Sequence, residues 1–331
     1  MINNSFWWKK RSKYLNFINI ILEFLIILKN IFINPYKSKL KIICVGNLVV
    51  GGSGKTPMVR YLRKILESKG YKCAVLLRGY GGSFKKPTRV IYEKHTSEEV
   101  GDEALMHAKD GLTIISKNRV KGCKYLEEYD LDILILDDGF QNLSLKKDFN
   151  LVVVSSNQGI GNNLILPFGP LRESISKARE RADIMIKSIF SEKQHYSFDI
   201  ISNYFEENLK ADYKTIIDED LNNNFILYTG IGDPAKFINA VKANKVKLSK
   251  SFIFRDHQEI SEKKAKQILI ISEEIKADIL TTEKDLMRLL NSKKNSFREK
   301  LFLKSKIARI QISLDKDNLL KKISEKLELK L

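Results

Sequence analysis

The stretch from Ile42 to Arg60, which reads IICVGNLVVGGSGKTPMVR, limits the possible folds of this chain more than any other segment. A short apolar run typical of a strand enters a glycine-rich turn, and a helical pattern follows the turn. Gly51, Gly52 and Gly54 allow successive backbone N–H groups to point at one anion, and the following helix adds its positive end. This layout predicts a phosphate-binding loop, or P-loop.

The predicted loop consists of Gly51, Gly52, Ser53, Gly54, Lys55 and Thr56. In a nucleoside triphosphate site, the Lys55 ammonium group reaches the β- and γ-phosphate oxygens and the Thr56 hydroxyl is a ligand of Mg²⁺. Val49 stands where the general pattern has glycine. The alternative is a glycine-rich connection with a chance GKT triplet, and the strand-turn-helix context favours the nucleotide site over it.

The composition indicates a globular protein that attracts polyanions. Its 331 residues, 43% of them hydrophobic, are enough for two domains with a proper core. The net charge of +18 predicts attraction to nucleic acid, an anionic membrane surface or a phosphorylated substrate, although a general abundance of lysine explains part of it equally well. Cys44, Cys73 and Cys123 lie in or beside apolar runs without a CxxC pair, which fits a reducing compartment. The scattered histidines predict no structural zinc.

The segment from Met1 to Tyr36 differs in composition from the rest of the chain. Trp7 and Trp8 precede a basic cluster, and the residues from 15 to 33 are mostly Ile, Leu and Phe. The polar residues of this run form one narrow stripe on a helix, opposite a wide apolar face: Asn16, Asn19, Glu23 and Asn30. The pattern predicts an amphipathic helix.

We interpret this helix as an interfacial anchor, peripheral or monotopic, with tryptophans at the headgroup level and basic residues toward anionic lipid. Glu23 and Lys29 leave fewer uninterrupted apolar residues than the roughly 18 to 20 that cross a bilayer. A removable signal peptide is not expected, since no small-residue cleavage site follows. The alternative is a first helix packed on its own domain or on another subunit, and the coincidence of aromatic, basic and apolar features favours the membrane.

From Leu40 onward, strand-like runs alternate with helical segments such as Val59 to Lys69 and Asp102 to Lys109. Runs such as ILIL and LVVV are apolar throughout, as in strands buried on both faces of a parallel sheet. We therefore expect an α/β fold with a P-loop NTPase-type three-layer core and a mainly parallel sheet. The expected strands are Lys41 to Val45, Cys73 to Leu77, Thr113 to Ser116, Ile133 to Leu136, Leu151 to Val154 and Ile184 to Lys187.

Acidic residues follow two of these patterns. Asp137 and Asp138 end the apolar run LDILIL, where a carboxylate can hold Mg²⁺ through water, although two acids before a glycine also fit a simple turn. Asp102 opens a helical segment, where it either caps the helix or accepts a proton from an attacking hydroxyl. Arg172, in LPFGPLRE, can meet a phosphate oxygen bidentately or lie in an ordinary loop, and Arg119 is a weaker candidate of the same kind.

Regular patterns become sparse between about Ile189 and Asp220, and we place a domain boundary there. The expected division is a membrane-associating helix at 1–36, a P-loop core at 37–213, and a smaller C-terminal α/β domain with linker strands at 214–331. Asp256 and His257 follow a short strand of this last domain. A lone histidine is more often structural, but this one lies where it can face a cleft.

Taken in order, the motifs VGNLVVGGSGKTP, VGDEA, DDGFQ, LPFGPLRE, TGIGDP, RDH and TTEKD resemble the tetraacyldisaccharide 4′-kinases, or lipid A 4′-kinases, of Gram-negative bacteria. The resemblance covers about residues 1 to 290. It implies an enzyme that uses ATP and Mg²⁺ to phosphorylate the 4′-hydroxyl of tetraacyldisaccharide 1-phosphate. The product is lipid IVA, and the implied location is the cytoplasmic face of the inner membrane. The domain at 37–213 would then be a kinase core.

The resemblance also implies roles for single residues. Lys55 and Thr56 match the phosphate- and Mg²⁺-binding residues, Asp137 and Asp138 match the second acidic element, and Arg172 and Glu173 match a segment near the nucleotide or the acceptor. Asp102 and His257 match the pair that activates the sugar hydroxyl. The chain departs from the family pattern at Ala104, Asn142 and Gln258, which puts any contact by Asn142 or Gln258 in doubt.

Two other classes of function are less compatible with the sequence. A membrane-associated P-loop ATPase that positions partner proteins would have lysine at position 50, where this chain has Val50. A nucleic-acid-binding module would explain the charge, but the charge is dispersed and no base-stacking aromatic motif is present. We therefore expect no nucleic acid partner, and we expect a monomer that meets its lipid substrate at the membrane surface.

Overall fold

The computed structural model describes residues 5–8, 15–192, 194–217 and 223–330, and the chain divides into two compact units. The P-loop unit contains Ile2–Arg78, Ser116–Tyr213 and Ile312–Leu331. The second unit contains Gly79–Ile115 and Lys214–Gln311. Strands β8 (Asn208–Ile217) and β12 (Ser305–Leu314) each contain a boundary between the units.

The sheet of the P-loop unit has the strand order β8-β7-β6-β1-β5-β2, and the described pairs are parallel. Its strands other than β8 are β1 (Lys41–Gly46), β2 (Cys73–Leu77), β5 (Ile133–Asp137), β6 (Phe149–Ser155) and β7 (Ile184–Ile189). Their apolar runs are almost completely buried, as strands covered on both faces require. The register pairs Val45 with Asp137, so the P-loop and the acidic pair follow neighbouring strand ends.

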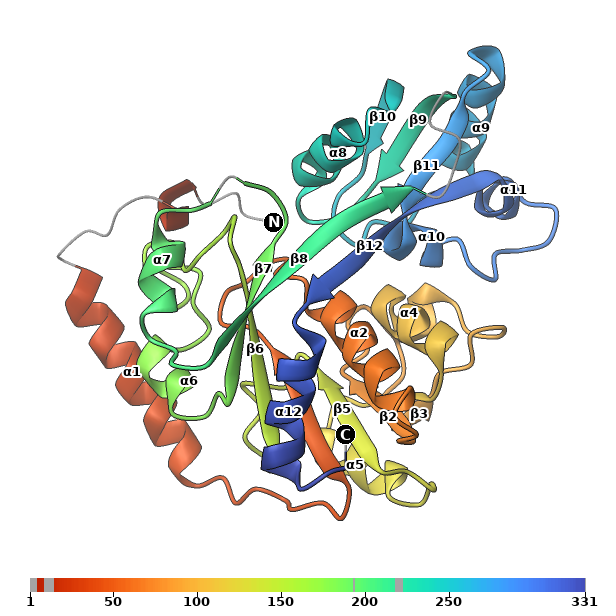
Figure 1. Ribbon diagram of the computed structural model, residues 1–331. Coiled ribbons are helices and arrows are strands. Elements are labelled where there is room, and N and C mark those ends of the chain that lie inside the picture. The colour runs from red at the N-terminus through yellow and green to blue at the C-terminus, as the bar shows by residue number, and fades with distance from the viewer. Residues whose placement is uncertain (1–4, 9–14, 193, 218–222, 331) are drawn as a thin grey trace. The chain divides into compact units, whose positions relative to one another are not determined.

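Helices pack on this sheet because their apolar residues recur at helical spacing and so form one apolar side. In α12 (Lys316–Leu327), Leu319, Leu320, Ile323 and Leu327 are buried, and α12 contacts β6. Figure 1 shows α12 in front of the strands. The other helical segments of the unit are η1 (Ser5–Trp8), α1 (Leu15–Ile31), α2 (Lys55–Glu67), α5 (Arg119–Leu126), α6 (Ile175–Arg179) and α7 (Ser197–Ser202).

Helix α1 has its polar side toward the protein. Asn19 is 7% exposed, its side-chain amide donates to Glu23 (2.9 Å), and its carbonyl oxygen accepts from the backbone N–H of Ile165 (2.8 Å). The apolar side faces outward, with Phe17 at 70% and Ile20 at 63% exposure. Among the described helices, none is both long and apolar enough to pass through a bilayer.

Both tryptophans, which we expected at the headgroup level of a membrane, contact the protein. The Trp7 indole N–H donates to the Pro167 carbonyl (3.1 Å), and the Trp8 ring meets His195 edge-on. The basic residues between 9 and 13 lie outside the described part of the chain.

The second unit has a parallel sheet of order β10-β9-β11-β12. Ile226 and Tyr228 of β9 (Asn224–Thr229) face α9 and α11, whereas Phe225 and Leu227 face α8, because alternate side chains of a strand point to opposite faces. The other elements are β3 (Thr88–Arg89) antiparallel to β4 (Thr113–Ile115), β10 (Lys247–Ile253), β11 (Asp278–Thr282), α3 (Ser97–Val100), α4 (Asp102–Asp110), α8 (Pro234–Ala243), α9 (Glu262–Glu274), α10 (Glu283–Met287) and α11 (Phe297–Lys304).

The fold class expected from the sequence is confirmed, and each of the six expected strands is present within a few residues of its expected limits. The grouping of segments differs from the expected division in two places. Residues 79–115 belong with the second unit because α4 packs on α10. Residues 312–331 belong with the P-loop unit because α12 buries its apolar side on β6.

Candidate active site

The loop from Gly51 to Thr56 has the backbone of an anion cradle. Gly51 has φ +126° and Gly54 has φ +90°, conformations that residues other than glycine rarely adopt. Helix α2 begins at Lys55 directly after the loop, so its unpaired N–H groups and positive end face the same place. The Ser53 hydroxyl is buried and has no hydrogen-bond partner within the described structure.

Side chains of β7 and β8 form hydrogen bonds with backbone carbonyl groups of the loop. The Ser188 hydroxyl donates to the Ser53 carbonyl (2.8 Å), and the Tyr213 hydroxyl donates to the Gly54 carbonyl (3.1 Å). The Tyr213 ring packs against Phe190, with ring centroids 4.6 Å apart. These contacts of the protein itself support the loop backbone.

We expect Gly54→Ala to destabilise the protein by about 1–3 kcal/mol, because a Cβ atom at the positive φ of Gly54 would lie 2.6 Å from Tyr213 Cε1. Urea unfolding without nucleotide measures this change. Gly52→Ala is the matched control: nothing lies within 4 Å of its Cβ position, and a change below about 1 kcal/mol is expected. Equal losses in the two variants would contradict this account of the loop.

The two acids after β5 contact the loop side chains. The Thr56 hydroxyl donates to Asp137 Oδ2 (3.0 Å), and Lys55 Nζ lies 3.6 Å from Asp138 Oδ1. Arg172 Nη1 also donates to Asp138 Oδ1, at 2.7 Å. The structure therefore brings together five of the side chains that the sequence predicted for nucleotide and metal binding.

Arg172 reaches this place because its segment pairs with the entrance of the loop. The Val50 N–H donates to the Pro170 carbonyl (2.9 Å), and the Arg172 N–H donates to the Leu48 carbonyl (2.8 Å). Val49, the departure from the general loop pattern, forms a bridge with Leu171. The LPFGPLRE segment is thus a backbone partner of the P-loop.

Charge balance keeps Asp138 ionised. Burial raises the pKa of its carboxyl, but Lys55 and then Arg172 lower it below its ordinary value. Asp138 itself has φ +57°, a left-handed conformation uncommon for a residue with a side chain. A strained, charged residue directly after a strand is typical of a functional site.

Arg119 and Glu173 are both buried beside this cluster. Arg119 donates to the Ser116 carbonyl (2.7 Å), while its Nε has no hydrogen-bond partner in the described part of the chain. Glu173 accepts hydrogen bonds from Gln141 (3.0 Å) and from Arg181. Burial raises the pKa of Glu173 although Arg181 opposes the shift. Its carboxylate is thus occupied by protein partners.

These residues fit a nucleotide with a divalent cation. A hydroxyl and a carboxylate 3.0 Å apart are hard oxygen donors of the kind that Mg²⁺ prefers. The loop supplies backbone donors, and the unpartnered Ser53 hydroxyl and Arg119 Nε supply two more. Lys55 adds the positive charge that a triphosphate requires.

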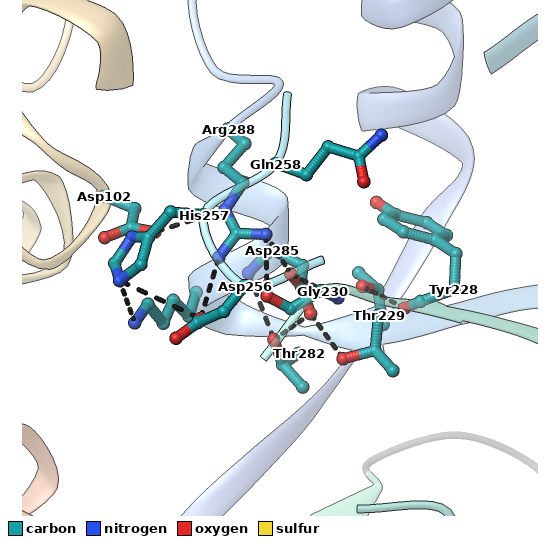
Figure 2. Close-up of polar contacts among 12 residues, drawn as sticks. Asp102, Tyr228, Thr229, Gly230, Asp256, His257, Gln258, Thr282, Asp285 and Arg288 are labelled. Atoms are coloured by element: carbon teal, nitrogen blue, oxygen red, sulfur yellow. Dashed lines mark hydrogen bonds and ion pairs between the residues drawn. The ribbon is translucent and has the colours of Figure 1, made fainter. Parts of the chain in front are cut away.

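Asp102 and His257 form a pair in the second unit. His257 Nδ1 lies 3.2 Å from Asp102 Oδ2, and the Glu103 N–H donates to Asp102 Oδ1 (2.9 Å). Asp102 is 3% exposed, whereas the His257 side chain is 30% exposed. His257 follows β10 with φ +58°, and Figure 2 shows its ring beside Asp102.

The surroundings keep Asp102 ionised. Burial raises the pKa of its carboxyl, but the hydrogen bond from His257 and the charges of Lys284, His257 and Arg288 lower it far below the ordinary value. Lys284 Nζ lies 3.4 Å from His257 Nε2 and 3.3 Å from Glu103. The Tyr80 ring covers the imidazole, with centroids 5.3 Å apart.

Sequence reasoning missed several residues of both clusters. Gln141 and Tyr213 support the loop side, and Lys284, Asp285 and Arg288 support Asp102. Gln141 lies in the DDGFQ motif, and Arg288 is a charged residue inside the apolar run LMRLL; both features could have identified these residues from the sequence. The Gln258 side chain accepts from the Arg255 N–H (3.0 Å) and the Asn142 side chain from Ser144 (2.9 Å), so each stabilises its own turn.

Comparisons with known proteins agree with one another. Residues 14–328 match the model of a family described as LpxK: Tetraacyldisaccharide-1-P 4′-kinase. The tetraacyldisaccharide 4′-kinase of Parvibaculum lavamentivorans is 34% identical over 275 residues, 81% of this chain and 78% of the relative. That of Rickettsia felis is 34% identical over 282 residues, 84% of this chain and 86% of the relative.

A solved structure resembles the fold as well. It is the "apo" form of LpxK from Aquifex aeolicus in complex with ATP, with a TM-score of 0.72 and 27% sequence identity. The match covers 94% of this chain and 98% of that one. The family model spans almost the whole sequence and both relatives exceed 30% identity, so the chain belongs to the tetraacyldisaccharide-1-P 4′-kinase family.

Proposed function

We propose that this protein transfers the γ-phosphoryl group of ATP, with Mg²⁺, to the 4′-hydroxyl of tetraacyldisaccharide 1-phosphate, giving lipid IVA. The observation that carries the proposal is the intact glycine cradle of a family member, with the Thr56 hydroxyl 3.0 Å from Asp137. The curated relatives are named for this reaction, and the structural neighbour is described with ATP.

In the proposed reaction the P-loop unit binds the nucleotide. A bound Mg²⁺ would supply positive charge against the negative charge of the triphosphate. Thr56, Asp137 and Asp138 are the residues that would hold it. Lys55 and Arg172, which pair with Asp138 in this structure, turn to the phosphate oxygens and stabilise the negative charge of the moving group.

The second unit supplies the proton acceptor. Asp102 takes the proton of the attacking hydroxyl, and His257 orients the Asp102 carboxylate through its Nδ1 contact. Phosphoryl transfer has a loose transition state, so the hydroxyl proton leaves late and a weakly basic carboxylate is an adequate acceptor. Arg119 and Glu173 act in the P-loop unit. Arg119 can donate to the nucleotide through Nε, which has no partner among the described residues, and Glu173 positions Gln141 by accepting its hydrogen bond.

We further propose that helix α1 binds the cytoplasmic surface of the inner membrane, where the acylated substrate lies. Asn19 fastens the polar side of α1 to the protein, which leaves the apolar side outward. A helix that served only as a packed first helix would bury that apolar side instead. Burial of exposed phenylalanine and isoleucine side chains in the interface supplies the affinity.

We expect the triple variant Phe17→Ser, Ile20→Ser, Phe24→Ser to lower membrane binding by more than about 10²-fold, since each large apolar side chain contributes about 1.5–3 kcal/mol when buried. Flotation with vesicles that contain anionic phospholipid measures the bound fraction. The matched control is Ile253→Ser, Leu303→Ser, Ile310→Ser, three exposed apolar residues of the second unit, which should bind as the wild type does. Unchanged flotation of the α1 variant, or of a chain without residues 1–36, would exclude α1 as the anchor.

A direct assay tests the reaction. Purified protein is incubated with γ-labelled ATP, Mg²⁺ and tetraacyldisaccharide 1-phosphate, and the lipid product is analysed for its phosphorylated position. We expect labelled product with a 4′-phosphate, and none after chelation of Mg²⁺. Label on another position, or ATP hydrolysis without lipid product, would refute the proposed acceptor. Light scattering of the purified protein tests the expected monomer.

A further inference from the structure

Arg288 is the buried cation of the second unit that contacts Asp102. It follows α10 directly, and its side chain is 4% exposed. Figure 2 shows its guanidinium group between the Asp102–His257 pair and the Asp285 carboxylate. A charged group removed from water to this degree is costly unless partners satisfy it, so its partners define its role.

The guanidinium group joins three parts of the unit. Its Nε donates to Asp102 Oδ2 (3.1 Å), and its Nη1 donates to the Gly230 carbonyl (3.1 Å) and contacts Asp285 Oδ1 (2.9 Å). The planar fork of arginine fixes these directions relative to one another, which a lysine ammonium group cannot do. The position of Asp102 Oδ2 is therefore tied to that of Gly230 and Asp285.

Asp285 in turn is anchored to the strand ends. It is 0% exposed, and it accepts hydrogen bonds from the Thr229 hydroxyl (2.7 Å), the Gly230 N–H (2.9 Å) and the Thr282 hydroxyl (2.7 Å). Thr229 ends β9 and Thr282 ends β11, neighbouring strands of the sheet. Asp285, the carboxylate that pairs with Arg288, is thus held by the ends of two neighbouring strands of the sheet.

A second arm of Arg288 points toward the turn that carries His257. Arg288 Nη2 lies 4.0 Å from Asp256 Oδ1, and both are buried atoms with no hydrogen-bond partner in the described structure. Asp256 Oδ1 is also 3.8 Å from His257 Nε2. Arg288 therefore contacts Asp102 directly and faces His257 through the neighbouring Asp256 carboxylate.

We propose that Arg288 is a positioning residue for the proton acceptor: its guanidinium group holds Asp102 Oδ2 in a fixed place relative to the β9 and β11 strand ends. This inference rests on the proposed function, because it concerns how Asp102 is held for the transfer. Arg288 itself contacts neither phosphate nor acceptor in this role.

The electrostatic surroundings of Asp102 allow a specific test. The charged or titratable groups that face it are His257, Lys284 and Arg288, with the carboxylates of Glu103, Asp256 and Asp285 beside them. Loss of one adjacent cation raises the pKa of a carboxyl by about 1–3 units. Replacement of Arg288 should therefore leave Asp102 ionised between about pH 5 and 8, so a change of rate in that range reports the position of the carboxylate rather than its charge.

Two variants separate charge from geometry. Arg288→Lys keeps the charge and loses the fork, and we expect kcat to fall about 10-fold with little change in the pH profile. Arg288→Gln loses both, and we expect kcat to fall about 10²-fold with an unchanged pH profile between about pH 5 and 8. The affinity for ATP, a property of the P-loop unit, should stay within about twofold in both.

A mutant cycle with Asp102 excludes a merely structural role. In the background of Asp102→Asn, the further change Arg288→Gln should lower the remaining activity less than about twofold, because both act through one carboxylate. Ile279→Val, a buried change in β11 that does not contact Asp102, is the control for general destabilisation of the unit. Circular dichroism and thermal unfolding measure the folded fraction of each variant.

The outcomes distinguish the two proposals. Wild-type kcat in Arg288→Gln, or losses that multiply in the double variant, would overturn the inference about Arg288 alone. Full activity of Asp102→Asn would instead overturn the assignment of Asp102 in the proposed function. Loss of activity in Arg288→Gln that only follows its folded fraction, with Arg288→Lys fully active, would also exclude the positioning role.

Discussion

Asp102→Ala and Asp102→Asn should each lower kcat by at least about 10²-fold, while the KM for ATP changes less than about twofold. Neither side chain can accept the proton of the hydroxyl group. In Asp102→Asn the shape of the side chain is kept, but its amide lacks the charge that His257 and Arg288 face. Single-turnover kinetics with labelled ATP measure the chemical step directly.

The pH dependence gives this prediction a second measurement. Because the pKa of Asp102 is lowered, its carboxylate stays ionised at every pH above its ordinary value of about 4. Asp102 should therefore not limit kcat/KM on the acid side between about pH 5 and 8. By the same linkage, the ionised group stabilises the fold above about pH 4, and that stability is lost as the pH falls toward the lowered pKa.

Asp110→Asn is the control, since Asp110 is the last residue of the same helix α4. Its activity should stay within about twofold of the wild type. His257→Ala should lose less activity than the Asp102 variants, because His257 orients the acceptor and does not replace it. Near-normal turnover in both Asp102 variants would show that another group accepts the proton.

Lys55→Ala is expected to lower kcat by at least about 10²-fold and to weaken ATP binding as well. The Lys55 side chain is 13% exposed, and the residue lies at the start of α2, with its ammonium group facing Asp138. Its loss removes one of the cations that stabilise the charge of the phosphoryl group in the transition state. It also leaves Asp138 paired with Arg172 alone.

The measurement is kcat and KM for ATP in the labelled-lipid assay, together with nucleotide affinity from calorimetry. Lys64→Ala removes an exposed lysine nine residues later in α2 and should behave as the wild type does. A Lys55→Ala enzyme with ordinary turnover would mean that the loop does not hold the transferred phosphate. In that case the cradle would serve a different ligand.

Much of the P-loop unit could be predicted from the sequence because its signals are local. Continuous apolar runs indicate buried parallel strands, and the limits of β2 agree with the expectation at both ends. The GGSGKT loop places glycines where positive φ is required, and the structure has Gly51 and Gly54 in such conformations. Asp137 and Asp138 were found because they follow an apolar run directly.

The support of Asp102 could not be predicted because it depends on contacts across long separations. Arg288 lies 186 residues from Asp102 in the chain, and only the packing of α4 on α10 brings them together. Helix α1 shows a related limit. Periodicity predicted a polar stripe and an apolar face, but it does not say which side meets the protein, and Asn19 faces inward.

The chain enters the second unit within β8 and returns to the P-loop unit within β12. Helix α12, which follows β12, then covers part of the sheet of the P-loop unit. The glycine loop is synthesised early, and α12, which packs on β6 of the same sheet, is synthesised much later. A nascent chain therefore exposes the apolar surface that α12 will cover until α12 itself has been synthesised. Truncation before α12 would thus destabilise the P-loop unit, most of which is synthesised earlier.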